Sequence, residues 1–462
     1  MYRAPAPCSM KAFRPVRCPR LRPRPGLAMS SLHQSFADAG VCESLERARP
    51  LLWLNPQESS NLESLPLSGR DLADAQARWD RLVPLLAHLF PSEAPTGRIA
   101  SDLVPAPSGL NLGLGQGARA FIKKDSHLPV CASVKARGGL YEVFCRAEKV
   151  ALEQGLLSVG EDYSKLATSP EIRAQLQRQE VAVGSTGNLG MSVGLAAAGL
   201  GMRATVHMSV DAKAWKKALL RSRGVNVVEH AGLYQEAVAA GRKLAEADPS
   251  CHFVDDESST TLFCGYSAAG RELQMQLAEQ GVEVSASQPL VVHIPCGVGG
   301  APGGILWGLK SIFGDSVRVF FAEPTHAPCV TAGLASGLHD GISVQDLGLD
   351  GRTEADGLAV QRPSGLACDV ASRLLAGCYT VEDGELFAEL ARLVDAGGDF
   401  LEVSCAAGLL GPRRLALDPR CTELLGGGTH VFWATGGNLV PAEERSAWLA
   451  RGRASLREAA RL

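Results

Sequence analysis

Lys135 is the side chain whose position carries the clearest chemical meaning in this sequence. It lies in the segment 133–137 (SVKAR), between a short apolar run and a stretch with helical spacing. An amine at the beginning of a helix is suited to hold an aldehyde cofactor as a Schiff base. Because isolated lysines are usually solvated surface groups, this interpretation depends on two glycine-rich segments elsewhere in the chain.

The first glycine-rich segment is 295–304 (PCGVGGAPGG), which follows the apolar run 290–294. Its glycines leave backbone N–H groups accessible, and the helix that follows adds a partial positive charge, so the segment suits a phosphate group. It is not a P-loop, since no Gly-Lys-Ser/Thr follows, and Pro302 breaks a GxGxxG motif. A tight strand-to-helix turn without a ligand is the structural alternative.

The second segment is 184–190 (GSTGNLG), where Ser185, Thr186 and Asn188 place hydroxyl and amide groups around one turn. Such a turn suits a carboxylate or phenolate oxygen. The same residue types are preferred helix N-caps, and we expect capping and ligand binding to coexist here. In a third segment Thr435 follows an apolar run and is suited to bond a ring nitrogen, although Thr is also common in such turns.

Together these segments supply what pyridoxal phosphate requires. The cofactor needs an amine for its aldehyde, N–H donors for its phosphate, a donor to its ring oxygen and a partner for its pyridine nitrogen. All the segments lie where an apolar run leads into a turn or helix, and ligands of α/β sheets bind at the carboxyl ends of strands. The sequence therefore predicts one pyridoxal-phosphate site.

The segments 133–144, 184–190, 295–304 and 434–441 resemble the D-serine dehydratase branch of the fold-type II pyridoxal-phosphate enzymes. The resemblance implies that Lys135 binds the cofactor aldehyde, that Asn188 bonds the ring oxygen and that Thr435 meets the pyridine nitrogen. It also implies that the phosphate is held by Gly297, Val298, Gly299, Gly300 and Ala301.

Two residues depart from the pattern that this resemblance leads us to expect, because each stands where we expect glycine. Ala301 is harmless if its φ is ordinary for an L-residue and strained if its φ is positive. Asn438 could displace the turn that places Thr435.

The chain alternates short β-branched runs with helical stretches, which is typical of a mostly parallel sheet covered on both faces. Region 35–95 reads as helical. The predicted strands are 120–123, 181–183, 204–207, 225–229, 252–254, 290–294, 317–322 and 430–434, and the predicted helices include 188–200, 212–223, 233–247, 260–280 and 303–313.

The resemblance implies an α/β fold like that of the tryptophan synthase β subunit, with two open, twisted, mostly parallel sheets flanked by helices in a large and a small domain. We expect residues 1–34 to be a disordered leader or one that is not translated, since the Arg- and Pro-rich residues 1–27 contain no acid and initiation at Met29 would remove them. The expected parts are a helical N-terminal portion of the large domain with Lys135 over 35–136, a small domain over 137–255 and the rest of the large domain over 256–462.

The activity that the resemblance implies is a carbon–nitrogen lyase reaction, the α,β-elimination that converts D-serine to pyruvate and ammonia, with D-threonine as a further substrate. We expect Lys135 to act as base or proton carrier, and Ser185 and Thr186 to bind the substrate carboxylate. A D-substrate calls for a second acid or base, and Thr186 and Asp256 are the candidates. A cap for the helix that follows is the structural alternative for Asp256.

Other functions stay open, because cofactor motifs do not fix substrate chirality. One is an L-serine or L-threonine dehydratase, or a related enzyme of β-elimination or β-replacement. Two alternatives belong to another functional class: a catalytically silent protein that binds pyridoxal phosphate, and a nucleotide-binding Rossmann protein. The sequence lacks the acid that a Rossmann protein should have after its first glycine loop.

Composition limits the binding partners and the cellular compartment that we expect for the protein. The 462 residues are 46% apolar with a net charge of −3, which provides a large core and no polybasic field for nucleic acid or an anionic membrane. No apolar run is long enough to cross a bilayer, and 13 cysteines without a CxxC pair favour a reducing cytoplasm. We expect a cytoplasmic enzyme acting on an amino acid, a monomer by resemblance, with no metal site beyond a monovalent cation at Glu323.

Overall fold

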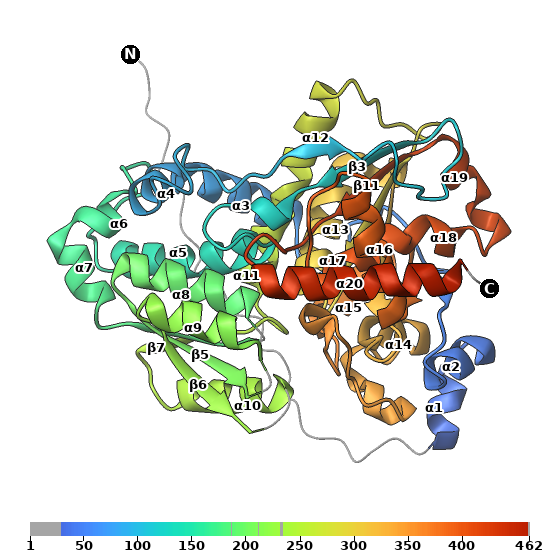
Figure 1. The fold of residues 1–462 in the computed structure, drawn as a ribbon. Helices are drawn as coiled ribbons and strands as arrows, with labels where there is room; N and C mark the ends of the chain where they lie inside the picture. Colours follow the sequence, from blue (N-terminus) through green and yellow to red (C-terminus); the bar gives the residue numbers. More distant parts are fainter. Residues whose placement is uncertain (1–28, 186, 211, 232–233, 461–462) are drawn as a thin grey trace.

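The structure is a computed structural model that describes residues 29–185, 187–210, 212–231 and 234–460. Over these residues the chain forms two parts, each built around its own sheet and covered by helices (Figure 1). The predicted α/β class with two mostly parallel sheets is confirmed.

The larger sheet has seven strands in the order β1-β10-β9-β8-β11-β3-β2. Its five inner strands run parallel, and the two edge strands β1 and β2 are antiparallel to their neighbours. Every residue of β8 is buried, as expected for a strand covered on both faces. The strands are β1 (Leu52–Leu54), β2 (Leu103–Pro105), β3 (Arg119–Lys123), β8 (Leu290–Pro295), β9 (Val317–Pro324), β10 (Gly377–Val381) and β11 (Thr429–Trp433).

The smaller sheet has four parallel strands in the order β6-β5-β4-β7. Parallel neighbours need crossover connections, and three helices between the strands supply them (Figure 1). The strands are β4 (Glu180–Gly184), β5 (Arg203–Ser209), β6 (Asn226–His230) and β7 (Cys251–Val254), and the helices are α8 (Asn188–Leu200), α9 (Ala214–Ser222) and α10 (Tyr234–Glu246).

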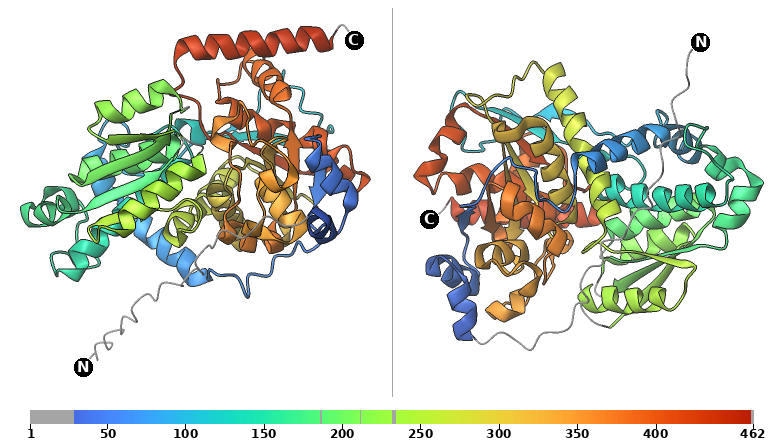
Figure 2. Two further views of the ribbon diagram at one scale, coloured as in Figure 1. Left: turned by 90° about the horizontal axis from the view of Figure 1, so that it is seen from below. Right: turned by 180° about the vertical axis from the view of Figure 1, so that it is seen from behind.

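The remaining helices cover both sheets, and α20 lies along the outside of the larger part, where it packs on α16 (Figure 2). They are α1 (Met29–Ser35), α2 (Ala39–Glu46), α3 (Gly69–Arg81), α4 (Val83–Leu89), α5 (Lys135–Glu153), α6 (Lys165–Thr168), α7 (Pro170–Leu176), α11 (Thr260–Ser267), α12 (Ala269–Glu279), α13 (Gly300–Phe313), α14 (Cys329–Ser336), α15 (Gly365–Leu374), α16 (Asp383–Asp395), α17 (Val403–Ala406), α18 (Gly411–Leu415), α19 (Thr422–Gly427) and α20 (Ala442–Ala459).

Some predicted elements differ from the observed ones. The region 35–95 is not helical throughout, because β1 pairs with β10 at the sheet edge. The stretch predicted as one helix over 260–280 is divided into α11 and α12 at Ala268. Helix α13 begins at Gly300, three residues before its predicted start, because the glycine loop itself forms the first turn.

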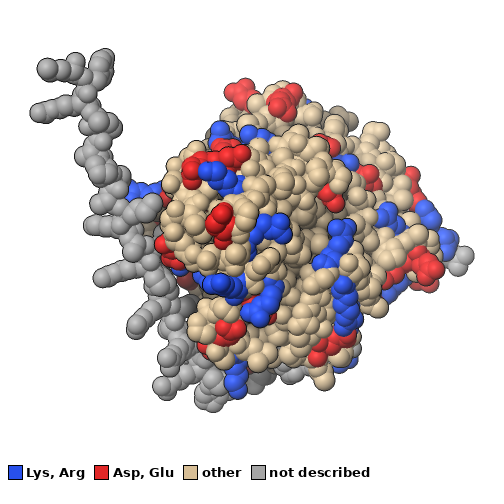
Figure 3. Space-filling view, turned by 90° about the vertical axis from the view of Figure 1, so that its left-hand side faces the viewer, with Lys and Arg blue, Asp and Glu red and all other residues tan. Residues whose placement is uncertain are grey.

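The predicted domain boundaries stay predictions. Residues 29–35 of the expected leader region form α1, in which Leu32 is buried, whereas residues 1–28 lie outside the described part of the chain. None of the described helices combines the length and apolar character that crossing a bilayer requires. On the face drawn in Figure 3, acidic and basic side chains are interspersed.

Candidate active site

A cavity lies where the two parts of the molecule meet, at the carboxyl ends of strands from both sheets. Gly184 at the end of β4, Pro295 at the end of β8 and Thr435 just beyond β11 all line it. The cavity is open on one side, and the empty space in it, open solvent included, is about 830 Å³. The two sheets therefore bring the three predicted segments to one place.

Lys135 is the first residue of α5, and it lines this cavity. The backbone just before it is tied to the Thr435 turn, since Val134 N–H donates to the Thr435 carbonyl at 2.8 Å and Ser133 pairs with Gly436. Lys135 Nζ donates to Asp256 Oδ2 at 2.8 Å, and its side chain is 19% exposed. The start of the helix thus holds the amine beside a carboxylate.

Asp256 is not the cap of the helix that follows it. Ser259 caps α11 by accepting from Leu262 N–H, and Asp255 accepts from the hydroxyl of Ser258. The other Asp256 oxygen, Oδ1, is buried and has no hydrogen-bond partner among the described residues. Asp256 lines the cavity, and a buried carboxylate oxygen without a partner is an unsatisfied group that calls for an explanation.

The turn after β4 serves as a helix cap and as a cavity wall. The Ser185 hydroxyl accepts from the N–H groups of Gly187 and Gly190 at 3.0 and 2.9 Å. Asn188 begins α8 and also lines the cavity. Thr186, predicted to bind the substrate and to act as an acid or base, lies outside the described residues. Ser185 therefore binds N–H groups at the start of α8 and lines the cavity, and its role in ligand binding stays a prediction.

The glycine loop meets the conditions for holding an anion. The backbone N–H groups of residues 297–301 donate to no acceptor in the described part of the chain, and the last two belong to the first turn of α13. Gly299 has a φ of +105°, and a Cβ there would lie 2.7 Å from that of Ala367. Free N–H groups at the start of a 14-residue helix fit a phosphate.

The two departures from the family pattern cause no strain. Ala301 lies within α13 and Asn438 is exposed, and neither is among the described residues with positive φ. The Asn438 carbonyl accepts from Arg445 Nη2 at 2.5 Å, which holds the turn after Thr435. An L-residue is therefore acceptable at both positions.

Thr435 lines the cavity beside a buried thiol that the sequence analysis did not single out. Its Oγ1 lies 3.0 Å from Cys405 Sγ, which also accepts from Gly436 N–H at 2.9 Å. Burial raises the pKa of Cys405 to about 12, so the thiol is neutral near pH 7. The Thr435 hydroxyl thus contacts the Cys405 thiol, and Thr435 also lines the cavity.

A charged group beside the cavity was not predicted from the sequence. It consists of Lys216 and Glu402, which line the cavity, and Asp356. Lys216 is 2% exposed, and its Nζ lies 3.1 Å from Asp356 Oδ2 and 3.8 Å from Glu402 Oε1. Burial opposes its charge, but attraction to both carboxylates is stronger and raises the pKa of Lys216. Burial and repulsion from Asp356 raise the pKa of Glu402, against the opposing effect of Lys216.

A buried network anchors the residues next to Lys135 and Thr435. Asp125 accepts from Arg137 Nε and Nη2, both at 2.8 Å, and from Trp433 Nε1 at 2.8 Å. Arg137 is two residues beyond Lys135, and Trp433 is two residues before Thr435. One carboxylate therefore fixes the start of α5 to the end of β11.

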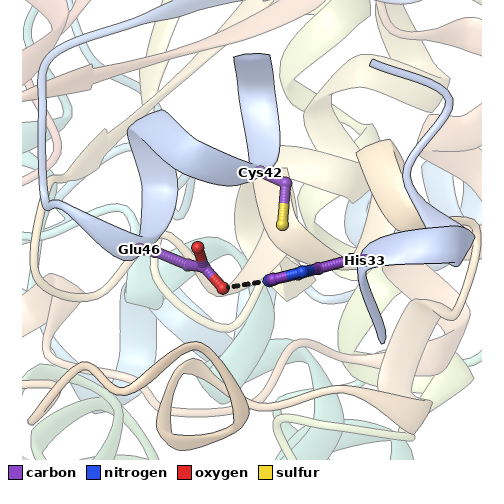
Figure 4. A group of neighbouring side chains, drawn as sticks. All are labelled: His33, Cys42 and Glu46. Atoms are coloured by element: carbon purple, nitrogen blue, oxygen red, sulfur yellow. Dashed lines mark hydrogen bonds and ion pairs between the residues drawn. The ribbon is translucent and has the colours of Figure 1, made fainter. Parts of the chain in front are cut away.

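The structure gives two observations on metal sites. Glu323 is buried, and its carboxylate accepts from Val330 and Thr331 at the start of α14; burial raises its pKa to about 7. In the described chain one group of three side chains, His33, Cys42 and Glu46, has ligand atoms close together. Figure 4 shows His33 Nε2 pointing at Glu46 Oε1 beside the thiol of Cys42. The two atoms form a hydrogen bond of 2.6 Å.

Comparisons with known proteins agree with this geometry. The family described as "Pyridoxal-phosphate dependent enzyme" matches residues 104–436. D-serine dehydratases of Escherichia coli O157:H7 (strain EC4115 / EHEC) and O139:H28 (strain E24377A / ETEC) are each 48% identical over 440 residues, covering 92% of this chain and 99% of theirs.

Solved structures show the same fold at low identity. Diaminopropionate ammonia lyase from Escherichia coli, in complex with D-serine, has a TM-score of 0.69 at 18% identity, covering 88% of this chain and 98% of that one. The processed form of threonine deaminase isoform 2 from Solanum lycopersicum has a TM-score of 0.58 at 20% identity, covering 86% of this chain and 93% of that one. The chain therefore belongs to the pyridoxal-phosphate dependent enzymes and, within them, to the family of its D-serine dehydratase relatives.

Proposed function

We propose that this protein is a D-serine ammonia-lyase, which converts D-serine to pyruvate and ammonia with pyridoxal phosphate. The observation that carries the proposal is the Lys135–Asp256 pair in the cavity that the glycine loop also lines. The near full-length identity to D-serine dehydratases supports the same substrate.

The residues around the cavity fit the cofactor. We infer that Lys135 binds the aldehyde, that residues 297–301 hold the phosphate, that Asn188 donates to the ring oxygen and that Thr435 faces the ring nitrogen. The free N–H groups at the start of α13 support the phosphate assignment. When bound, pyridoxal phosphate withdraws electrons from Cα of the amino acid and makes its proton acidic.

The chain's own groups must then bind the substrate and move protons. Lys135 Nζ and Asp256 Oδ2 are 2.8 Å apart, so a proton can pass between amine and carboxylate. The Ser185 hydroxyl accepts two backbone N–H groups, which leaves its hydrogen to donate to the substrate carboxylate. We keep Thr186 as a second carboxylate ligand and as an alternative acid or base.

The reaction requires few further groups from the protein beyond those that bind the substrate and transfer protons. The Cα proton is taken up, the Cβ–O bond breaks with loss of water, and the released enamine is hydrolysed to pyruvate and ammonia. D-threonine carries the same leaving group with one more methyl, and we propose it as a further substrate. A neutral Thr435 hydroxyl leaves the ring a weaker electron sink than a carboxylate would, which suits a substrate with a leaving group at Cβ.

The test is an absorption spectrum of the purified protein before and after D-serine, with pyruvate release measured separately for D- and L-serine. We expect a cofactor band that D-serine alters, and pyruvate from the D-isomer. Pyruvate from L-serine alone would indicate an L-serine or L-threonine dehydratase. Uptake of the cofactor with no turnover of either isomer would indicate a silent binding protein.

The proposal also covers the compartment, the oligomeric state and the domain boundaries of the enzyme. We propose a cytoplasmic monomer, supported by the free cysteines of the described chain, with domain boundaries near residues 136 and 255. All four strands of the smaller sheet fall between those positions. A dependence of activity on K⁺ or Na⁺ would test a monovalent cation near Glu323, and size-exclusion chromatography with light scattering would test the monomer.

A further inference from the structure

Glu402 lies between the turns that carry Asn188 and Thr435, the residues expected to face the ring oxygen and the ring nitrogen of the cofactor. It directly precedes α17 and is 6% exposed. Its carboxylate accepts from Asn188 Nδ2, with distances of 3.2 and 3.4 Å to its two oxygens. Its backbone N–H donates to the Gly436 carbonyl at 3.1 Å, in the turn that carries Thr435. Glu402 therefore connects the Asn188 turn of the small sheet with the Thr435 turn of the large one.

Lys216 holds this carboxylate in place from the other side. The Lys216 stem packs on Gly187, where an added Cβ would lie 2.2 Å from Lys216 Cδ. Its ammonium group is fixed by Asp356 at 3.1 Å and lies 3.8 Å from Glu402. A buried carboxylate without a nearby cation would be costly, so the lysine allows Glu402 to carry charge inside the cavity wall.

The chemistry of an amide makes this contact directional. The Asn188 side chain has one acceptor oxygen and one NH2 group, and either can face a neighbour. A carboxylate accepts only, so it admits the NH2 group and repels the amide oxygen. One hydrogen of Nδ2 is thereby directed to Glu402, and the other remains for the cavity.

We propose that Glu402 is a positioning residue that fixes the Asn188 amide so that its N–H group faces the ring oxygen of pyridoxal phosphate. The proposal rests on the proposed function, because Asn188 is assigned to the ring oxygen there. A Gln at position 402 offers both a donor and an acceptor. The Asn188 amide then gains a second orientation, in which its oxygen opposes the ring oxygen.

The experiment measures cofactor uptake by apoprotein, without any substrate. For Glu402→Gln we expect pyridoxal phosphate to bind at least about tenfold more weakly, the effect of one hydrogen bond to a charged group, and the near-visible absorption maximum to shift. The matched control is Glu389→Gln, since Glu389 is a fully buried carboxylate that accepts from Arg392 and Arg413 away from the cavity. The control should lose thermal stability and keep the wild-type affinity and spectrum.

A double-mutant cycle with Asn188→Ala separates positioning from general damage. If Glu402 acts through the amide, Glu402→Gln changes neither affinity nor spectrum further in the Asn188→Ala protein. Should Glu402→Gln fail to fold, Lys216→Met replaces it in the same cycle, because loss of the cation favours the uncharged form of Glu402.

The proposal is overturned if Glu402→Gln binds the cofactor like wild type, or if its effect persists undiminished in the Asn188→Ala background. Wild-type protein that takes up no cofactor overturns the proposed function, and this inference with it. Wild type that binds and turns over D-serine, alongside an unaffected Glu402→Gln, overturns this inference alone.

Discussion

Lys135 Nζ donates a hydrogen bond of 2.8 Å to Asp256 Oδ2, although the two residues are 121 positions apart in the chain. The amine lies at the start of α5, and the carboxylate lies in the loop between β7 and α11. Asp256 also packs on the glycine loop, where a Cβ on Gly300 would lie 3.0 Å from Asp256 Oδ1. One carboxylate thus contacts the two segments expected to hold opposite ends of the cofactor.

Replacing Lys135 with Ala should abolish turnover, because the other lysine that lines the cavity, Lys216, is held by Asp356. We expect pyruvate formation at the level of a protein-free control and no adduct at position 135 after borohydride reduction and peptide mapping. Lys217→Met is the matched control, since Lys217 is buried but bonds Glu229. A reduced adduct on another lysine of the wild-type protein would contradict the assignment.

Asp256→Asn should leave cofactor uptake largely intact and slow turnover of D-serine. The amide keeps the size of the carboxylate but cannot accept a proton from Lys135 Nζ. We expect kcat to fall by about 10²–10⁴-fold, the usual contribution of a general acid or base, with a smaller change in KM. Steady-state kinetics with the cofactor spectrum as a loading check would measure this. An unchanged kcat would show that the ion pair is only structural.

Gly299→Ala should weaken cofactor binding. With φ at +105°, an L-residue is strained at this position, and its Cβ would meet Ala367 at 2.7 Å. We expect affinity for pyridoxal phosphate to fall about tenfold or more as the loop N–H groups shift. Gly314→Ala is the matched control, because Gly314 ends the same helix with positive φ and has no atom within 4 Å of an added Cβ. The Gly314→Ala variant should lose about 1–2 kcal/mol of stability and keep the wild-type affinity for pyridoxal phosphate. Equal affinities of the two variants for the cofactor would contradict the assignment of the loop to the phosphate.

Asp125→Asn should destabilise the fold through its buried partner Arg137. Burial alone would raise the pKa of Asp125, but the Arg137 guanidinium outweighs burial and lowers it. Since the folded pKa is depressed, the stabilisation is present above the unfolded value of about 3.9 and is lost as pH falls through the folded pKa. We expect urea denaturation near pH 7 to show a loss of about 3–5 kcal/mol, as for a broken buried ion pair.

An exposed carboxylate provides the comparison for this variant. Asp395 pairs with Arg453 on the surface, and both side chains are 46% exposed. Asp395→Asn should therefore change the unfolding free energy little. If Asp125→Asn were as stable as Asp395→Asn, the network would not anchor α5 to β11.

Local sequence patterns were sufficient for the elements that form the site. The predicted helix over 188–200 coincides with α8, and the apolar run 290–294 is β8, because period and turn residues act over a few neighbours. The edge strands β1 and β2 were not predicted. Each has three residues, too few for an alternation to show. The strand β1 pairs with the distant β10, and β2 pairs with β3, the next strand in the chain.

By itself the sequence determined which segments were candidates for the site: Lys135, the 184–190 turn, the glycine loop and Thr435 follow from residue type and local spacing. Only the tertiary structure decided that Asp256 pairs with Lys135 instead of capping α11, and that Glu402 and Lys216 reach the cavity. The reason is physical. Backbone conformation and capping depend on neighbours in the chain, whereas a buried ion pair depends on where two sheets bring distant side chains.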